Sequence, residues 1–100
     1  MPEKETVYID KDLEQLIPDY LDNRRNDAVR IREALQNEDF EAIRIIGHNM
    51  KGTGGGYGFD ALTLKGGEIQ AAALRRESIA LLRLSDELLD YIGGIEIVYV

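Results

Sequence analysis

The sequence contains no cysteine and only one histidine among its 100 residues. Without cysteine the chain can form neither a disulfide nor a thiolate metal site, and one histidine alone makes a poor metal site. No apolar segment approaches the roughly 20 residues that a membrane-spanning helix needs. The first residues, MPEKETVYID, lack the basic start and the apolar run of a signal peptide, so we expect a soluble cytoplasmic protein.

Positive charge is also scarce. Twelve Lys and Arg stand against nineteen Asp and Glu, which gives a formal net charge of -7. A surface of this charge repels nucleic-acid phosphates and anionic lipid headgroups, so we expect neither nucleic acid nor a membrane as a partner. At this length the chain can bury one modest core, which predicts one domain over residues 1–100 and argues against a large cleft between domains.

Apolar residues recur at helical spacing in four segments. The expected helices cover residues 11–36, 39–54, 59–75 and 77–93, with short polar breaks between them. Pro18 is expected to kink the first helix or to start its main part, and Gly66 would permit close contact of the third helix with a neighbour. Gly93 and Gly94 mark a helix end. Four amphipathic helices with short connections predict an all-α fold, an antiparallel up-down-up-down four-helix bundle.

The two ends of the chain differ from this helical pattern. The segments TVYID (6–10) and IEIVYV (95–100) are β-branched and aromatic, which is typical of strands. Both ends of an up-down-up-down bundle emerge on the same side. We therefore expect the two segments to meet as a small antiparallel strand pair.

His48 lies on the polar side of the second predicted helix. With about 100° per residue, the apolar side chains of Ile43, Ile46 and Met50 cluster within about 60°, and the imidazole points roughly 160° away from their centre. We therefore expect His48 to face solvent. The residues that share its face are Arg44, Ile45, Lys51, Gly52 and Gly55.

The composition of this face suggests a surface for phosphoryl transfer between proteins. Gly52 and Gly55 would let another protein approach the imidazole closely, although a glycine costs about 1 kcal/mol relative to alanine inside a helix. Arg44 and Lys51 supply the positive charge that an anionic phosphoryl group requires. Ile45, apolar and exposed, would suit a docking surface.

Simpler interpretations of these residues remain open. A lone histidine on a helix surface often has no specific role, and the glycines after it could form an ordinary loop. These glycines match neither of the two common phosphate-binding patterns, G-x-G-x-x-G and G-x-x-x-x-G-K-S/T. A metal site using His48 and Glu41 lacks further ligands, and a hydrolase triad would have no base other than His48.

The sequence around the histidine resembles a known family. The spacing H-x-x-K-G-x-x-x-x-x-G is formed by His48, Lys51, Gly52 and Gly58, and it is followed by Leu62 and by GGEIQAAA. This pattern is similar to that of the histidine-containing phosphotransfer (HPt) domains of multistep two-component signalling. The likeness extends over nearly the whole chain, including LIPDYLDNRRND ahead of the motif. The family fold is an antiparallel helical bundle, as the periodicity also predicts.

The resemblance implies a relay protein. His48 would accept a phosphoryl group on Nε2 from the phosphoaspartate of a response regulator receiver domain, or return it to one. Lys51 would support the phosphoryl oxygens, and Gly52 would clear space for the receiver domain. A hybrid histidine kinase would be a further partner, Mg²⁺ would be bound by the receiver domain, and this chain would need no cofactor of its own. It would be a monomer and, without an ATP-binding module, not an autonomous enzyme.

Two other functional classes stay open. A non-phosphorylated helical adaptor would use the same fold to bind signalling partners, and a small enzyme would use His48 as a general base within a concave pocket. The chain also departs from the commoner family pattern, because Gly54, Gly55, Gly56 and Tyr57 replace residues that are often alanine, serine or leucine. These departures bear on where the second helix ends.

Overall fold

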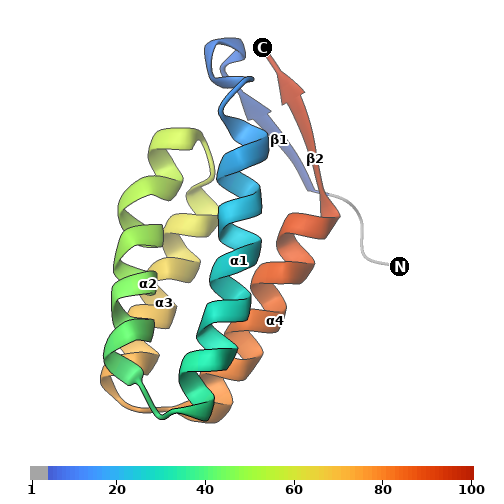
Figure 1. The fold of residues 1–100 in the computed structure, drawn as a ribbon. Coiled ribbons are helices and arrows are strands. Elements are labelled where there is room, and N and C mark those ends of the chain that lie inside the picture. Colours follow the sequence, from blue (N-terminus) through green and yellow to red (C-terminus); the bar gives the residue numbers. More distant parts are fainter. Residues whose placement is uncertain (1–4) are drawn as a thin grey trace.

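The computed structural model describes residues 5–100, in which four helices pack side by side and two short strands lie at one end (Figure 1). The helices are α1 (Ile17–Gln36), α2 (Phe40–Gly54), α3 (Asp60–Leu74) and α4 (Ser78–Gly94). Helix α2 packs mainly against α3, and α1 packs against α4. Successive helices alternate in direction, so the predicted up-down-up-down bundle is confirmed. None of these four helices is long and apolar enough to cross a bilayer.

The helix bounds follow the sequence prediction except at the start of the first helix. Helix α1 begins at Ile17, and the predicted first turns are instead a separate 3-10 turn, η1 (Lys11–Leu13). Pro18 lies in the first turn of α1, where its missing N–H has no intrahelical partner to lose. Asp39 begins α2 as its N-cap, with its Oδ1 accepting a hydrogen bond of 3.1 Å from the N–H of Ala42.

The core is formed by the apolar stripes of the four helices. The predicted stripe of α2 is buried, with Ile43 and Met50 fully inaccessible to solvent. Aromatic rings close the end of the core nearest the strands, where Tyr20 stacks on Tyr57 at 4.1 Å between ring centroids and on Phe59 at 6.0 Å. The core therefore supports α2 along one side and leaves its opposite side to solvent.

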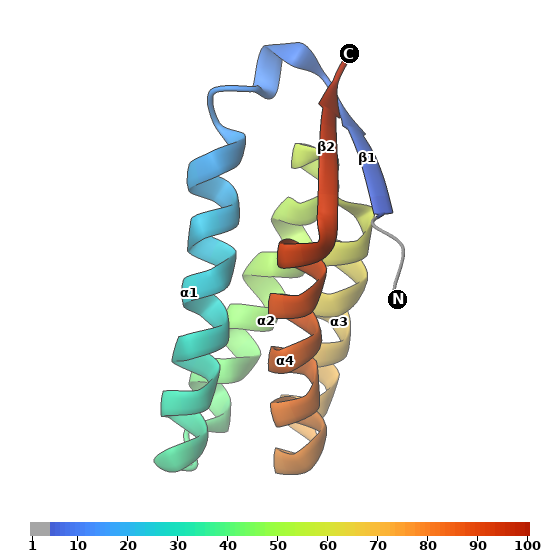
Figure 2. The ribbon, with the colours of Figure 1, turned by 90° about the vertical axis from the view of Figure 1, so that its right-hand side faces the viewer.

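The terminal segments form the predicted strand pair, but the predicted direction is wrong. Strands β1 (Glu5–Ile9) and β2 (Ile95–Tyr99) are parallel, with Val7 opposite Ile97. The antiparallel expectation assumed that β1 leads straight into the bundle. Instead, residues 10–16 reverse the chain, so β1 and β2 both point away from the helices (Figure 2).

Candidate functional site

His48 lies on the solvent face of α2 and is exposed, as the helical wheel predicts. The neighbouring Gly47 and Met50 are buried. The imidazole therefore projects from a turn of helix whose other side is held by the bundle. A nucleophile in this position is open to a second protein without any opening of the fold.

Helix α3 supports this turn from behind through very close backbone contact. A Cβ placed on Gly66 would lie 2.3 Å from the amide nitrogen of Lys51, and a Cβ placed on Gly47 would lie 2.6 Å from the amide nitrogen of Gln70. Real Cβ atoms do not tolerate such distances, so both positions require glycine in this packing. The predicted role of Gly66 in close helix contact is confirmed.

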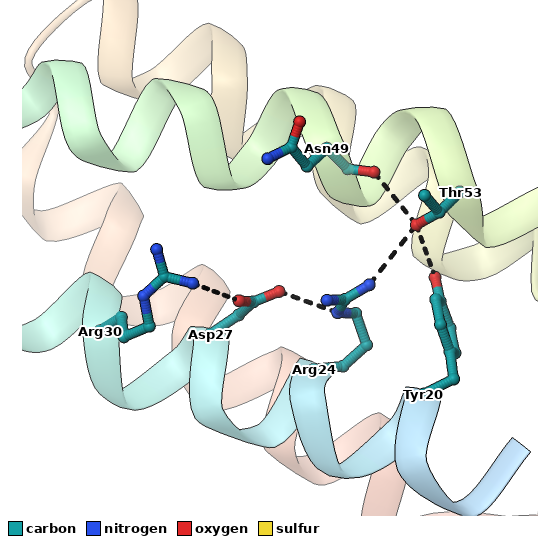
Figure 3. Close-up of polar contacts among 6 residues, drawn as sticks. All are labelled: Tyr20, Arg24, Asp27, Arg30, Asn49 and Thr53. Carbon is teal, nitrogen blue, oxygen red and sulfur yellow. Dashed lines mark hydrogen bonds and ion pairs between the residues drawn. The ribbon is translucent and has the colours of Figure 1, made fainter. Parts of the chain in front are cut away.

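Helix α1 supports the same part of α2 through a polar network (Figure 3). Thr53 Oγ1 donates a hydrogen bond of 3.0 Å to the backbone carbonyl of Asn49. Its single hydrogen is then used, so the hydroxyl of Tyr20, 3.0 Å away, acts as donor to the same oxygen. Arg24 Nη1 also donates to Thr53 Oγ1, at 3.4 Å. These bonds join α1 to the helical turn that follows His48.

Asp27 carries a buried charge next to this network. Its carboxylate lies 2.8 Å from Arg24 Nε and 3.2 Å from Arg30 Nη1, and only 5% of the residue is exposed. Burial raises the pKa of Asp27 above its ordinary value, although both arginines act in the opposite direction. The guanidinium of Arg24 also lies over the ring of Tyr20, 4.7 Å from its centroid.

Sequence reasoning missed this network. Its only signal is an Arg-x-x-Asp-x-x-Arg spacing at residues 24–30. That spacing is typical of exposed helix surfaces, where such pairs contribute little to stability. The contact with Thr53 depends on how α1 packs against α2.

The two predicted cations of the site differ in their partners. Arg44 forms a bidentate ion pair with Glu41, with N–O distances of 2.9 and 2.5 Å. This hydrogen bonding raises the pKa of Arg44 and lowers that of Glu41, and it locally compensates the arginine charge. Lys51 has no ion-pair partner within residues 5–100. Lys51 therefore offers the less compensated of the two charges.

The Lys51 side chain leans towards α3. Its Cδ lies 3.8 Å from the point where a Cβ of Gly67 would stand. The aliphatic stem thus lies against the glycine surface of α3, and the residue as a whole is exposed. Lys51 therefore remains accessible to a partner on the surface of α2.

The small and apolar residues of the predicted face have separate environments. Around Gly52 there is open space, because no atom lies within 4 Å of a Cβ added there. Ile45 is 45% exposed. Gly55 lies beyond α2 in the 3-10 turn η2 (Gly55–Tyr57), and its N–H donates to Thr63 Oγ1 at 2.8 Å. Gly52 and Ile45 are therefore open to a partner, whereas Gly55 is also tied to the α2–α3 connection.

Gly58, the last glycine of the motif, has a backbone role. Its φ angle is 94°, in the left-handed region that favours glycine, and it ends η2 before α3 begins. A Cβ there would also lie 2.6 Å from Cδ1 of Ile9 in β1. The motif thus combines one glycine that leaves a surface bare, Gly52, with one that shapes the chain, Gly58.

Among the described residues, metal-ligating side chains do not gather at the histidine. Within residues 5–100 there is no group of three or more His, Asp or Glu side chains placed to hold a metal ion. Comparisons of the chain with protein-family models, with curated proteins and with solved structures found no match. The function therefore has to be argued from the site itself.

Proposed function

We propose that this chain is a phosphorelay intermediate of the HPt kind, which accepts a phosphoryl group on His48 and passes it to another protein. The observation that carries the proposal is the exposed imidazole of His48 on α2, a helix that α1 and α3 both support. The bare surface of Gly52 lies one turn away. Relay between proteins requires an accessible nucleophile and a surface that a large partner can approach. Both requirements are met without a pocket.

The transfer step needs only the imidazole from this chain. In the neutral tautomer with its hydrogen on Nδ1, the Nε2 lone pair of His48 attacks the phosphorus of an aspartyl phosphate. A N–P bond forms as the P–O bond to the aspartate breaks, and the carboxylate leaves with the electron pair. The ring charge that develops can be relieved by loss of the Nδ1 proton to water. Reversal of these steps on a second aspartate completes the relay.

Neighbouring residues serve positioning and charge in this proposal. Phosphoryl transfer depends mainly on alignment and on stabilisation of the equatorial oxygens. Lys51 supplies a cation that no carboxylate of residues 5–100 neutralises, whereas Arg44 contributes less because Glu41 is bound to it. Gly52 and Ile45 meet the partner surface. Gly55 holds the end of the face through its bond to Thr63.

The proposed partners are receiver domains of response regulators, with a hybrid histidine kinase as the source of phosphate. In this scheme the receiver domain holds the Mg²⁺ and the aspartate. The present chain contributes the nucleophile, His48, and the cation of Lys51.

A phosphotransfer profile tests the proposal against a purely adaptor role. Receiver domains encoded in the same genome as this chain are phosphorylated chemically with acetyl phosphate. They are then repurified and mixed with the protein. A relay protein gains acid-labile, base-stable phosphate at the expense of at least one receiver, and it returns that phosphate to a fresh receiver. An adaptor binds a receiver but gains no phosphate, which would overturn the proposed function.

A further inference from the structure

The terminal sheet has an open edge beside the start of α3. Each of its two strands pairs only with the other, so neither outer edge has a neighbouring strand within residues 5–100. Along β1 the outer edge borders a shallow groove of about 260 Å³. The groove is lined by Glu5, Thr6, Val7, Tyr8, Gly58, Asp60, Ala61 and Tyr91.

The ladder determines which backbone groups of β1 are free. The carbonyl of Ile9 accepts from the N–H of Val100, so Ile9 faces β2. In a parallel ladder alternate residues direct both of their backbone groups to the same neighbour. Val7 therefore also faces β2, and the N–H and C=O groups of Thr6 and Tyr8 point to the open edge. Such a row of unpaired groups is a template for a further strand.

The groove beside this edge is negatively charged. Glu5 and Asp60 line it together with the phenol of Tyr91, and among residues 5–100 no basic residue lines it. Burial and the two carboxylates raise the pKa of Tyr91 to about 12, which is the effect expected of a local negative field. The positive end of α3 offsets only part of this field, since a helix N-terminus carries about half an elementary charge.

We propose that the β1 edge binds an extended segment of a partner protein as a third strand, with a lysine or arginine of that segment lying in the groove between Glu5 and Asp60. Main-chain hydrogen bonds to Thr6 and Tyr8 would supply affinity, and the acidic groove would supply selectivity for a basic residue. The groove is smaller than the roughly 300–1,000 Å³ of sites for small-molecule ligands. It suits a single side chain.

A third strand would also relieve a weakness of the sheet. A two-stranded sheet is only marginally stable in water without further support. The outward face is already apolar at Tyr8 and Val98, which oppose each other in the register and are 66% and 37% exposed. A bound strand would extend this face. The surface lies on the terminal sheet rather than on the His48 face of α2, so binding there is independent of the proposed phosphoryl transfer.

The test uses a blocked hexapeptide of alternating valine and threonine with one central lysine, together with the same peptide carrying glutamate instead. We expect the lysine peptide to bind the full chain in NMR titrations and to shift and protect the amides of Thr6 and Tyr8. The glutamate peptide should bind about tenfold or more weakly, as expected for loss of a charge-assisted contact. His48→Gln should leave binding unchanged.

Two pairs of variants distinguish binding at the β1 edge from nonspecific attraction between opposite charges. Thr6→Pro removes an outward N–H but no bond to β2, and it should weaken binding about tenfold, whereas Thr6→Ala should bind normally. Slow exchange of the Val100 amide would show that the β1–β2 ladder survives the proline. Glu5→Gln with Asp60→Asn should abolish the preference for lysine, whereas the charge-matched pair Glu33→Gln with Glu68→Gln should retain it. No binding, or equal binding of the two peptides to the wild-type chain, would overturn the proposal.

Discussion

The backbone of Gly66 in α3 lies against the backbone of Lys51 in α2, so closely that a Cβ on Gly66 would stand 2.3 Å from the Lys51 amide nitrogen. Gly52 is the next residue along α2. A Cβ added to Gly52 would have no neighbouring atom within 4 Å. The two glycines, Gly66 in α3 and Gly52 in α2, thus have distinct uses next to the same turn of α2. One allows helices to touch, and the other leaves a surface bare.

This contrast predicts opposite effects of the same substitution. Gly66→Ala should lower the free energy of unfolding by about 1–3 kcal/mol, because overpacking outweighs the gain in helix propensity. Gly52→Ala should raise it by up to about 1 kcal/mol. Urea unfolding followed by circular dichroism measures both. A stabilised Gly66→Ala variant would mean that α2 and α3 do not pack as closely as described.

Bulk at Gly52 should slow phosphoryl transfer without unfolding the protein. Gly52→Gln adds a side chain between the imidazole and an approaching receiver domain, so both the transfer rate and receiver affinity should fall. Lys51→Ala should slow transfer by removing charge stabilisation while affecting receiver affinity less. Rates and affinities are measured beside thermal stability. Wild-type transfer by Gly52→Gln would show that the glycine does not keep the surface clear for a partner.

The terminal strand pair should contribute to stability. Deletion of residues 95–100 removes the half-buried side chains of Ile95, Ile97 and Tyr99, and it should cost at least about 1–2 kcal/mol. Half-buried and exposed side chains alternate along β2, which supplies a matched comparison. Ile97→Ala, at a half-buried position, should destabilise the protein more than Val98→Ala, at an exposed one. Unchanged stability of the truncated chain, with random-coil chemical shifts for the tail of the full one, would contradict the pairing.

Asp27 should make stability depend on pH in a defined direction. Its pKa in the folded protein lies above the ordinary 3.8, so folding favours the protonated form. Its stabilising contribution is complete below the ordinary value and is lost as pH rises through the folded-state pKa. The difference in free energy of unfolding between the two proteins, wild type minus Asp27→Asn, should therefore decrease as the pH rises from about 3 to neutrality. A rise over this range would show that Arg24 and Arg30 outweigh the desolvation of the carboxylate.

The sequence predicts those features that depend on local periodicity. The helices of residues 39–93 were expected within one residue of their observed bounds, because their apolar stripes and polar breaks are regular. The exposure of His48 follows from the same periodicity. The parallel direction of β1 was not predictable, since it depends on how residues 10–16 reverse the chain.

The polar contacts of the site were also not predicted from the sequence. Arg44 was expected to add charge beside the histidine, but a neighbouring Glu41 compensates it through an i,i+3 ion pair. The bond of Tyr20 to Thr53 joins residues 33 positions apart. Neither contact has a pattern that distinguishes it from ordinary surface residues. The Tyr20–Thr53 bond depends on how α1 packs against α2, whereas the Arg44–Glu41 pair lies within α2 alone.

Identification of the phosphorylated residue after incubation with a phosphorylated receiver domain tests the central claim most directly. Mass spectrometry under neutral conditions, with His48→Gln as the comparison, locates the phosphate. We expect the wild type to carry phosphate on His48, and we expect the variant to carry none while keeping its helical circular dichroism and melting temperature, since an exposed imidazole contributes little to packing. Phosphate on another residue, or equal labelling of the folded His48→Gln variant, would contradict the account.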